Sequence, residues 1–284
     1  MNQLNRRSFI SQGAALAGAA LLAPGLLHGK NPLLIKGPIG FQSWIVRKSI
    51  EEDFPGALKK MAGLGYNSIE MCSPPGYAKM GFGPLEKLKA PELKKIIKDE
   101  GFICISCHYG FDEMKEHAQE RIDFAKALGL KQMIVSTFGL PKEATLSDWK
   151  KAADELNRLG EQSKKAGIQM GFHNHNGEFE KLEGELIYDV LLKQFDPSLV
   201  KMQFQVSVIS IGYNAADYFK KYPGHFISAH LYDWSGTGRE MVPLGTGKVD
   251  WKEFFAAAKT GGVKNYFVEM ENGLKESAEF LRNF

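Results

Sequence analysis

Short apolar runs alternate with amphipathic stretches from Ile35 to the C-terminus, at the spacing of roughly thirty residues that βα units require. The apolar runs have the length of buried strands, and they are Ile39 to Trp44, Ser68 to Cys72, Ile103 to Cys107, Gln132 to Thr137, Gln169 to His173, Lys201 to Val206, Phe226 to Leu231 and Tyr266 to Met270. The stretches between them have the mixed charge of surface helices, and they are Phe54 to Leu64, Pro91 to Glu100, Glu113 to Leu128, Leu146 to Ala166, Gly184 to Gln194, Ala215 to Tyr222, Trp251 to Lys259 and Leu274 to Arg282. Eight such units predict an α/β protein whose parallel strands close into a (β/α)8 TIM barrel.

Glycines follow several of the predicted helices, at Gly65, Gly101, Gly129, Gly167 and Gly262. A glycine at this place accepts the left-handed conformation that turns the chain toward the next strand. No linker or composition shift interrupts the series, so we expect residues 31–284 to form a single domain. The alternative is a doubly wound open sheet, but the glycine-rich phosphate loop that usually follows its first strand is missing from the sequence.

The first thirty residues have the succession of segments that is typical of an export signal, and we do not expect them to belong to the folded domain. Asn5-Arg6-Arg7-Ser8-Phe9-Ile10 resembles a twin-arginine signal, and an Ala- and Leu-rich stretch follows it over residues 13–27. The alternative is an uncleaved anchor, but the unbroken apolar stretch is shorter than the ~20 residues that a span requires. We therefore predict a twin-arginine-type signal over residues 1–30, a periplasmic or otherwise exported protein, and no membrane contact after signal removal.

Charge and cysteine content narrow the function classes. The net charge is only +3, and no basic run is longer than two residues, so we expect no nucleic-acid partner. The segment Cys104-Ile105-Ser106-Cys107-His108 matches the C-x-x-C-H pattern of haem attachment. It also reads as a buried strand, in which residues three apart point to opposite faces and cannot both reach one haem. Structural cysteines, including Cys72, are the favoured interpretation.

Polar groups stand at the ends of most of the predicted strands. In a parallel barrel these carboxyl ends converge on one pocket. The groups are Trp44, Glu70, Cys72, His108, Ser136, His173, His175, Gln205, His230, Asp233, Glu269 and Glu271. Aromatic rings, imidazoles and carboxylates on one rim suit a small sugar-like ligand, because rings stack on sugar faces while hydroxyl groups need donors and acceptors.

Four motifs carry a resemblance to a known family. They are Gly167-Ile168-Gln169-Met170-Gly171-Phe172-His173-Asn174-His175, His230-Leu231-Tyr232-Asp233, Gly245-Thr246-Gly247-Lys248-Val249-Asp250-Trp251 and Tyr266-Phe267-Val268-Glu269. With them the chain resembles the xylose isomerase-like TIM barrels, which include sugar isomerases and epimerases, inosose dehydratases and endonuclease IV. The resemblance covers essentially the whole chain after residue 30.

The resemblance implies a divalent metal, Mn, Zn or Co, held at the ends of the fifth to eighth strands. The family's usual ligands there are Glu, Asp, His and Glu, and the matching positions are His173, Gln205, His230 and Glu269. Two positions match, while His173 replaces a glutamate and Gln205 an aspartate. Only one carboxylate remains to balance the ion, so weaker metal binding is expected.

The resemblance also implies roles for the rim residues. Glu269 is the expected base. Because the second glutamate of the two-base epimerases is missing, its expected catalytic partner is a histidine, namely His173 or alternatively His175 or His108. Six residues are expected to contact the substrate, namely Trp44, Glu70, His108, His175, Trp234 and Arg239.

The expected function is that of an exported, metal-dependent sugar isomerase or epimerase that acts by enolisation next to a carbonyl. Export favours an unphosphorylated sugar or keto-sugar derivative as its small-molecule partner. A keto-glycoside lyase or hydrolase, or a dehydratase, is an alternative on the same barrel. A non-catalytic sugar-binding barrel with a degraded metal site is another, and an endonuclease IV-like enzyme is opposed by the charge. The oligomeric state stays open.

Overall fold

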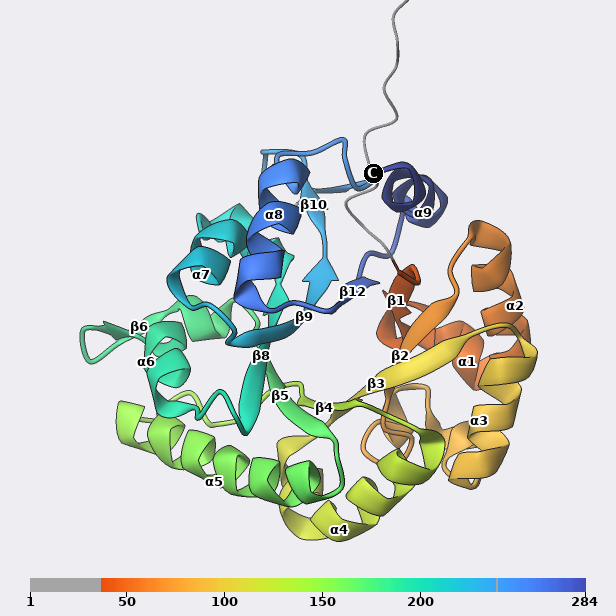
Figure 1. Ribbon diagram of the computed structural model, residues 1–284, viewed down its shortest axis with the longest axis horizontal. Coiled ribbons are helices and arrows are strands. Elements are labelled where there is room, and N and C mark those ends of the chain that lie inside the picture. Colours follow the sequence, from red (N-terminus) through yellow and green to blue (C-terminus); the bar gives the residue numbers. More distant parts are fainter. Residues whose placement is uncertain (1–36, 239) are drawn as a thin grey trace, which may run out of the picture. The chain divides into compact units, whose positions relative to one another are not determined.

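The computed structural model describes residues 37–284 except Arg239, and these residues form the predicted (β/α)8 barrel. Its eight parallel strands close in the order β1-β2-β3-β4-β5-β8-β9-β12, with the helices around them (Figure 1). The barrel strands are β1 Gly40–Gln42, β2 Ser68–Cys72, β3 Ile103–Tyr109, β4 Gln132–Val135, β5 Gln169–His173, β8 Val200–Gln205, β9 Phe226–Leu231 and β12 Asn265–Val268. The helices are α1 Arg47–Glu52, α2 Phe54–Leu64, α3 Ala90–Asp99, α4 Phe111–Leu128, α5 Leu146–Lys165, α6 Ile187–Gln194, α7 Ala215–Lys221, α8 Trp251–Gly261 and α9 Leu274–Asn283.

The predicted export signal lies outside the described residues, so export and the boundary at residue 31 stay predictions. No helix among residues 37–284, Arg239 aside, is long and apolar enough to span a membrane.

Local sequence signals place the element boundaries well. The bounds of β2, β5, β9 and α2 are those predicted. Helix α2 begins where the Asp53 side chain accepts a hydrogen bond from the Gly56 amide at 3.0 Å, and it ends at Gly65, whose φ is 104°. All five predicted helix-ending glycines have positive φ, which confirms their role. Strands β4 and β12 end two residues before the predicted bounds, because pairing in the barrel stops at Val135 and Val268.

Two hairpins outside the barrel were not predicted. The helix expected over residues 184–194 begins only at Ile187, because Glu185–Leu186 (β7) pairs with Lys181–Leu182 (β6). The two turn residues, Glu183 and Gly184, both have positive φ, at 51° and 85°, as the favoured two-residue hairpin turn requires. The prediction of a helix was therefore wrong for residues 184–186.

The second hairpin lies in the long segment after β9, which was expected to be a loop. Asp233–Trp234 (β10) pairs with Met241–Val242 (β11). The fully buried Asp233 carboxylate accepts hydrogen bonds of 2.9–3.1 Å from the Trp251 indole and four backbone amides. Asp233 therefore organises this segment and has no carboxylate oxygen left over for the rim pocket.

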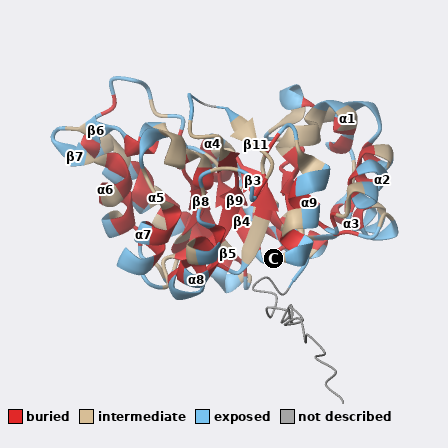
Figure 2. Ribbon diagram, turned by 90° about the horizontal axis from the view of Figure 1, so that it is seen from above, coloured by how far each residue is buried: buried red, intermediate tan, exposed pale blue. Residues whose placement is uncertain are grey.

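Apolar and polar side chains divide between the two faces of the barrel wall. The face toward the helices is apolar, with side chains such as Phe172 and Phe204 completely buried, and Figure 2 shows this buried zone between strands and helices. A completely buried set of polar side chains faces the other way, into the barrel, and consists of Gln42, Glu70, Ser106, Gln203 and Ser228. This polar layer is unlike the branched apolar filling that is usual for the fold, and it supports the site above it.

Candidate functional site at the carboxyl end of the barrel

Three imidazoles meet inside the carboxyl end of the barrel. They belong to His108 on β3, His173 on β5 and His230 on β9, and one ring nitrogen of each lies within 4.8 Å of the others. The ring centroids of His173 and His230 are 4.4 Å apart, and each lies 5.1 Å from that of His108. Because His108 sits inside the barrel, the C-x-x-C-H segment does not present it to a haem.

Glu70 lies beneath these rings and contacts two of them, those of His108 and His230. Its side chain is completely buried, and each of its oxygens accepts more than one hydrogen bond. Oε1 accepts from the Ser106 hydroxyl at 2.5 Å and from the Gln203 amide at 2.8 Å. Oε2 accepts from the Gln42 amide at 2.8 Å and lies 2.5 Å from His230 Nε2. Burial alone would raise the pKa of Glu70, but the charges of His108 and His230 hold that pKa well below its usual value.

His230 lies between two carboxylates. Its Nε2 faces Glu70, and its Nδ1 lies 3.1 Å from Glu269 Oε2. Burial disfavours the charged ring, but the negative charges of Glu269 and Glu70 outweigh it and raise the pKa of His230 to about 10. In the metal-free protein the ring is therefore an imidazolium at neutral pH.

Two buried side-chain atoms of neighbouring strand-end residues have no hydrogen-bond partner among the described residues. They are His173 Nδ1 and Gln205 Oε1, while Gln205 Nε2 donates to Glu269 Oε2. Burial, together with the neighbouring imidazoles, lowers the pKa of His173 well below its usual value, so its ring is neutral and carries a free lone pair. Buried polar atoms are rarely left unpaired, and their clustering here indicates a ligand.

The three imidazole nitrogens of His108, His173 and His230, with the unpaired atoms beside them, offer ligands for a divalent metal. His173 and Gln205 supply the two unpaired atoms, and Glu269 and His230 supply a carboxylate beside an imidazole nitrogen. A ligating histidine usually gives its other ring nitrogen to a carboxylate, and Glu70 occupies that place for His230. His108 is the neighbour that the predicted ligand set did not contain. Its Nε2 lies 2.6 Å from Gln203 Oε1.

The expected substrate contacts are distributed differently from the prediction. Glu70 is completely buried below the imidazoles rather than on the rim, because the inward positions of β2 place it one layer down. His175 is exposed, with its ring edge-on to His173 at 4.8 Å. The Trp44 ring is half-buried and packs against Tyr77 and under the Arg47 guanidinium.

The remaining two expected contacts lie in the segment after β9. Trp234 is half-buried, and its indole nitrogen donates to the Gly238 carbonyl at 3.0 Å. Arg239 lies outside the described residues.

The polar layer under the site was missed from the sequence, although a signal for it exists. In a strand the inward positions recur every second residue. Ser106, Gln203 and Ser228 each stand two residues before a rim residue, at His108, Gln205 and His230. Asn174, a predicted strand-end residue, accepts through its Oδ1 a hydrogen bond from the backbone amide of Gln205 at 3.1 Å. A polar residue two positions before a rim residue on the same strand is therefore expected to lie in the layer that supports the rim.

Comparison with known proteins gives the same fold and a consistent set of relatives. The family described as "Xylose isomerase-like TIM barrel" matches residues 58–284. An inosose dehydratase of Clostridium perfringens (strain 13 / Type A) is 27% identical over 199 residues, and the match covers 64% of this chain and 64% of the relative. The chain thus spans just under two thirds of the length of this curated relative, and about half (53%) of that of a second one.

Solved structures of the same fold cover more of the chain. A sugar phosphate isomerase/epimerase from Parabacteroides distasonis ATCC 8503 is 26% identical, with a TM-score of 0.67 and coverage of 86% of this chain and 97% of its own. A structure of the IOLI protein, described with a binding zinc atom, is 14% identical, with a TM-score of 0.63 and coverage of 87% and 95%. At that identity the likeness shows the fold alone.

Proposed function

Because the chain belongs to the xylose isomerase-like TIM barrel family, we propose that it is a metal-dependent enzyme that removes a proton next to the carbonyl of a sugar or keto-sugar. The observation that carries the proposal is the set of His173 Nδ1 and Gln205 Oε1, both buried without a partner, beside the Glu269 carboxylate. A purely structural polar cluster would satisfy these atoms internally, as the layer around Glu70 does.

Glu269 is the proposed base. Its side chain is 21% exposed, so a ligand above the rim can reach it. Burial acts to raise its pKa, but the charge and hydrogen bond of His230 and the Gln205 amide keep that pKa below its usual value, and the carboxylate is ionised at neutral pH. It can accept the proton from the carbon next to the carbonyl, which leaves an enediolate.

His175 is the proposed proton donor on the solvent side. Its ring is exposed and lies next to His173, so it can exchange protons with water and return one to the enediolate. The residues that would hold the metal are His173, Gln205, His230 and Glu269. When bound, a divalent ion supplies positive charge that stabilises an oxyanion.

Dehydration is the second candidate reaction. It begins with the same proton removal and then needs an acid for the departing hydroxyl group. The curated relatives named inosose dehydratases favour it, and His175 and His108 offer imidazoles for that step. A product that has lost water would distinguish this candidate from isomerisation or epimerisation.

Export belongs to the same proposal and rests on Arg6-Arg7 and the apolar stretch after them. It favours an unphosphorylated substrate. Cell fractionation of the wild type and of the Arg6→Lys/Arg7→Lys variant tests it. Retention of only the variant inside the cytoplasm supports export, and equal distribution of the two proteins overturns it.

The proposed reaction is tested by metal content and by isotope exchange. The purified protein should bind Mn²⁺, Zn²⁺ or Co²⁺, and the loaded protein should exchange a carbon-bound proton of keto-sugars with solvent deuterium, followed by NMR. Metal binding without exchange on any keto-sugar would contradict the reaction. Sugar binding with neither metal nor exchange would identify a non-catalytic binding barrel.

A further inference from the structure

A cavity lies at the end of the barrel opposite the candidate site and takes no part in the proposed reaction. It has a volume of about 500 Å³. Six barrel strands line it near their amino ends, through Ile105, Gln132, Gln169, Lys201, Ile227 and Asn265. Four lysines lie around it, namely Lys131, Lys164, Lys201 and Lys264, and no acidic residue belongs to its described lining. The molecule thus has a strongly basic hollow in a chain that is nearly neutral overall.

The lysines of this hollow are not neutralised by the part of the chain that the structure describes. None of them forms a salt bridge there. Lys201 Nζ donates to the Gly224 carbonyl at 2.5 Å, and Lys164 Nζ reaches the Ser198 hydroxyl at 3.4 Å. Burial, followed by the charge of Lys264, lowers the pKa of Lys201, so these two ammonium groups repel each other. Lys164 also lies near Asp196, so Lys201 and Lys264 carry the argument.

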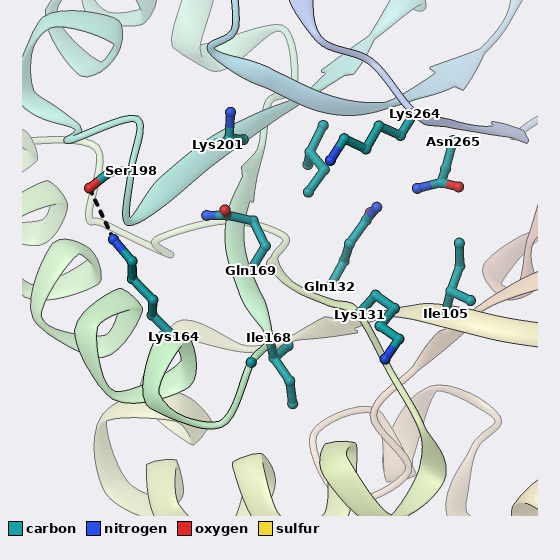
Figure 3. Close-up of a pocket in the computed structure, with 12 residues that line it drawn as sticks. Ile105, Lys131, Gln132, Lys164, Ile168, Gln169, Ser198, Lys201, Lys264 and Asn265 are labelled. Atoms are coloured by element: carbon teal, nitrogen blue, oxygen red, sulfur yellow. Dashed lines mark hydrogen bonds between the residues drawn. The ribbon is translucent and has the colours of Figure 1, made fainter.

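A second, independent observation concerns Gln132. Its side chain is only 2% exposed, and its Oε1 has no hydrogen-bond partner in the described residues. Figure 3 shows Gln132, Lys264 and Asn265 pointing toward the middle of the pocket, with Lys131 and Lys164 at its edge. Amide oxygen and nitrogen differ only by a rotation, so this side chain can present either a donor or an acceptor to a bound molecule.

We propose that the amino-terminal mouth of the barrel binds a small multivalent oxyanion, such as a pyrophosphate or a tricarboxylate, between Lys201, Lys264 and the Gln132 amide. Such an ion accepts charge-assisted hydrogen bonds from both ammonium groups and relieves their repulsion. An oxygen of the bound ion forms a hydrogen bond with the Gln132 amide group. Without the ion, the buried Oε1 of Gln132 has no hydrogen-bond partner among the described residues. Because the site is open to solvent, its affinity falls as salt is added.

Titration calorimetry of the full-length protein with sodium pyrophosphate, and separately with citrate, tests the proposal. We expect Lys201→Gln/Lys264→Gln to weaken binding at least about tenfold, since it removes two charge-assisted contacts. The control Lys59→Gln/Lys60→Gln removes the same charge from the exposed face of α2 and should stay within about twofold of the wild type. Both variants leave the carboxyl-end site intact, so binding through a metal there would be unaffected.

Lys264→Gln alone guards against misfolding. Lys264 is exposed, and its side chain makes no hydrogen bond in the described part of the chain, so this variant should keep the melting temperature of the unliganded wild type and still bind the anion more weakly. Weaker binding of pyrophosphate or citrate by the two pocket variants, Lys201→Gln/Lys264→Gln and Lys264→Gln, supports the proposal. The comparison of the two anions shows whether the site prefers phosphate or carboxylate ligands. Absence of binding to the wild type, or equal binding by wild type and pocket variants, overturns it.

Discussion

The two ends of the barrel differ in how the charges of their side chains are balanced. At the carboxyl end, His108 and His230 each lie beside a buried carboxylate, and Glu70 alone accepts hydrogen bonds from Ser106, Gln203, Gln42 and His230. At the amino end, four lysines surround a hollow without an acidic lining residue among those described. The balanced end holds its side chains in fixed positions, as catalysis requires. The unbalanced end is only complete when a ligand supplies the missing charge.

Removal of the proposed base should have the largest effect. Glu269→Gln keeps the shape of the side chain but cannot accept a proton, so we expect solvent deuterium exchange to fall roughly 10³-fold. Glu271→Gln is the matched control, because its carboxylate stands two residues further on and is 70% exposed. It should retain exchange near the wild-type rate. Equal rates in the wild type and Glu269→Gln would mean that another group is the base.

Neutralising Glu70, which accepts hydrogen bonds from several side chains of the polar layer, should have the next largest effect. Glu70→Gln leaves His230 and His108 without their shared buried carboxylate, and breaking such a pair costs about 3 kcal/mol or more. Urea unfolding at pH 7 measures the loss. Glu51→Gln, on the exposed surface of α1, should stay within about 0.5 kcal/mol of the wild type. If both variants unfold at the same urea concentration, Glu70 does not hold the carboxyl end together.

At the carboxyl end, one buried carboxylate has no positively charged neighbour among the described residues, so the balance of charge there is not complete. Glu178, in the 3-10 turn Gly177–Phe179, accepts the His175 amide at 2.7 Å, and burial raises its pKa to about 7. Between pH 4.5 and 7 the folded protein keeps a proton on Glu178 that the unfolded chain has released. Its stabilising contribution is therefore complete below pH 4.5 and is lost as the pH rises to 7.

Glu178→Gln should remove this pH dependence, which amounts to about 3 kcal/mol from the size of the shift. Unfolding free energies at pH 5 and pH 8 measure it, and the variant should be the more stable protein at pH 8. Glu185→Gln, in β7 and exposed, should retain the wild-type dependence. The expectation is contradicted if the unfolding free energies of the wild type and of Glu178→Gln change equally between pH 5 and pH 8.

The smallest effect belongs to the amino end. Without an anion, Lys264→Gln removes one of two repelling charges, so the unfolding free energy should change by less than about 0.5 kcal/mol and in the stabilising direction. The pKa of Lys201 should rise, and NMR of its side chain measures the change. A destabilised Lys264→Gln protein would mean that Lys264 already has a partner in the folded chain.

Much of the fold was predictable because its signals are local. The strand Ser68–Cys72 is a short apolar run, and α2 has an acidic cap before it and Gly65 after it. The hairpin at Glu183 and Gly184 was missed because its strands are only two residues long. A helix pattern that begins nearby hid it.

The candidate site was predictable only in its upper layer. His173, Gln205, His230 and Glu269 were found as strand ends. In the structure Glu269 contacts Gln205 and His230, and one side-chain atom each of His173 and Gln205 is unpaired. The role of Glu70 could not be predicted. A buried glutamate within Ser68–Cys72 gives no indication of which side chains will surround it.

The sequence by itself determined the eight βα units and, through the period of two, which polar residues face into the barrel. Only the tertiary structure decided which of them meet. Closure of the sheet brings Glu70 to His230 across 160 residues and His108 to Gln203 across 95. Strand register sets these partners, and register arises from the pairing of all eight strands rather than from any one segment.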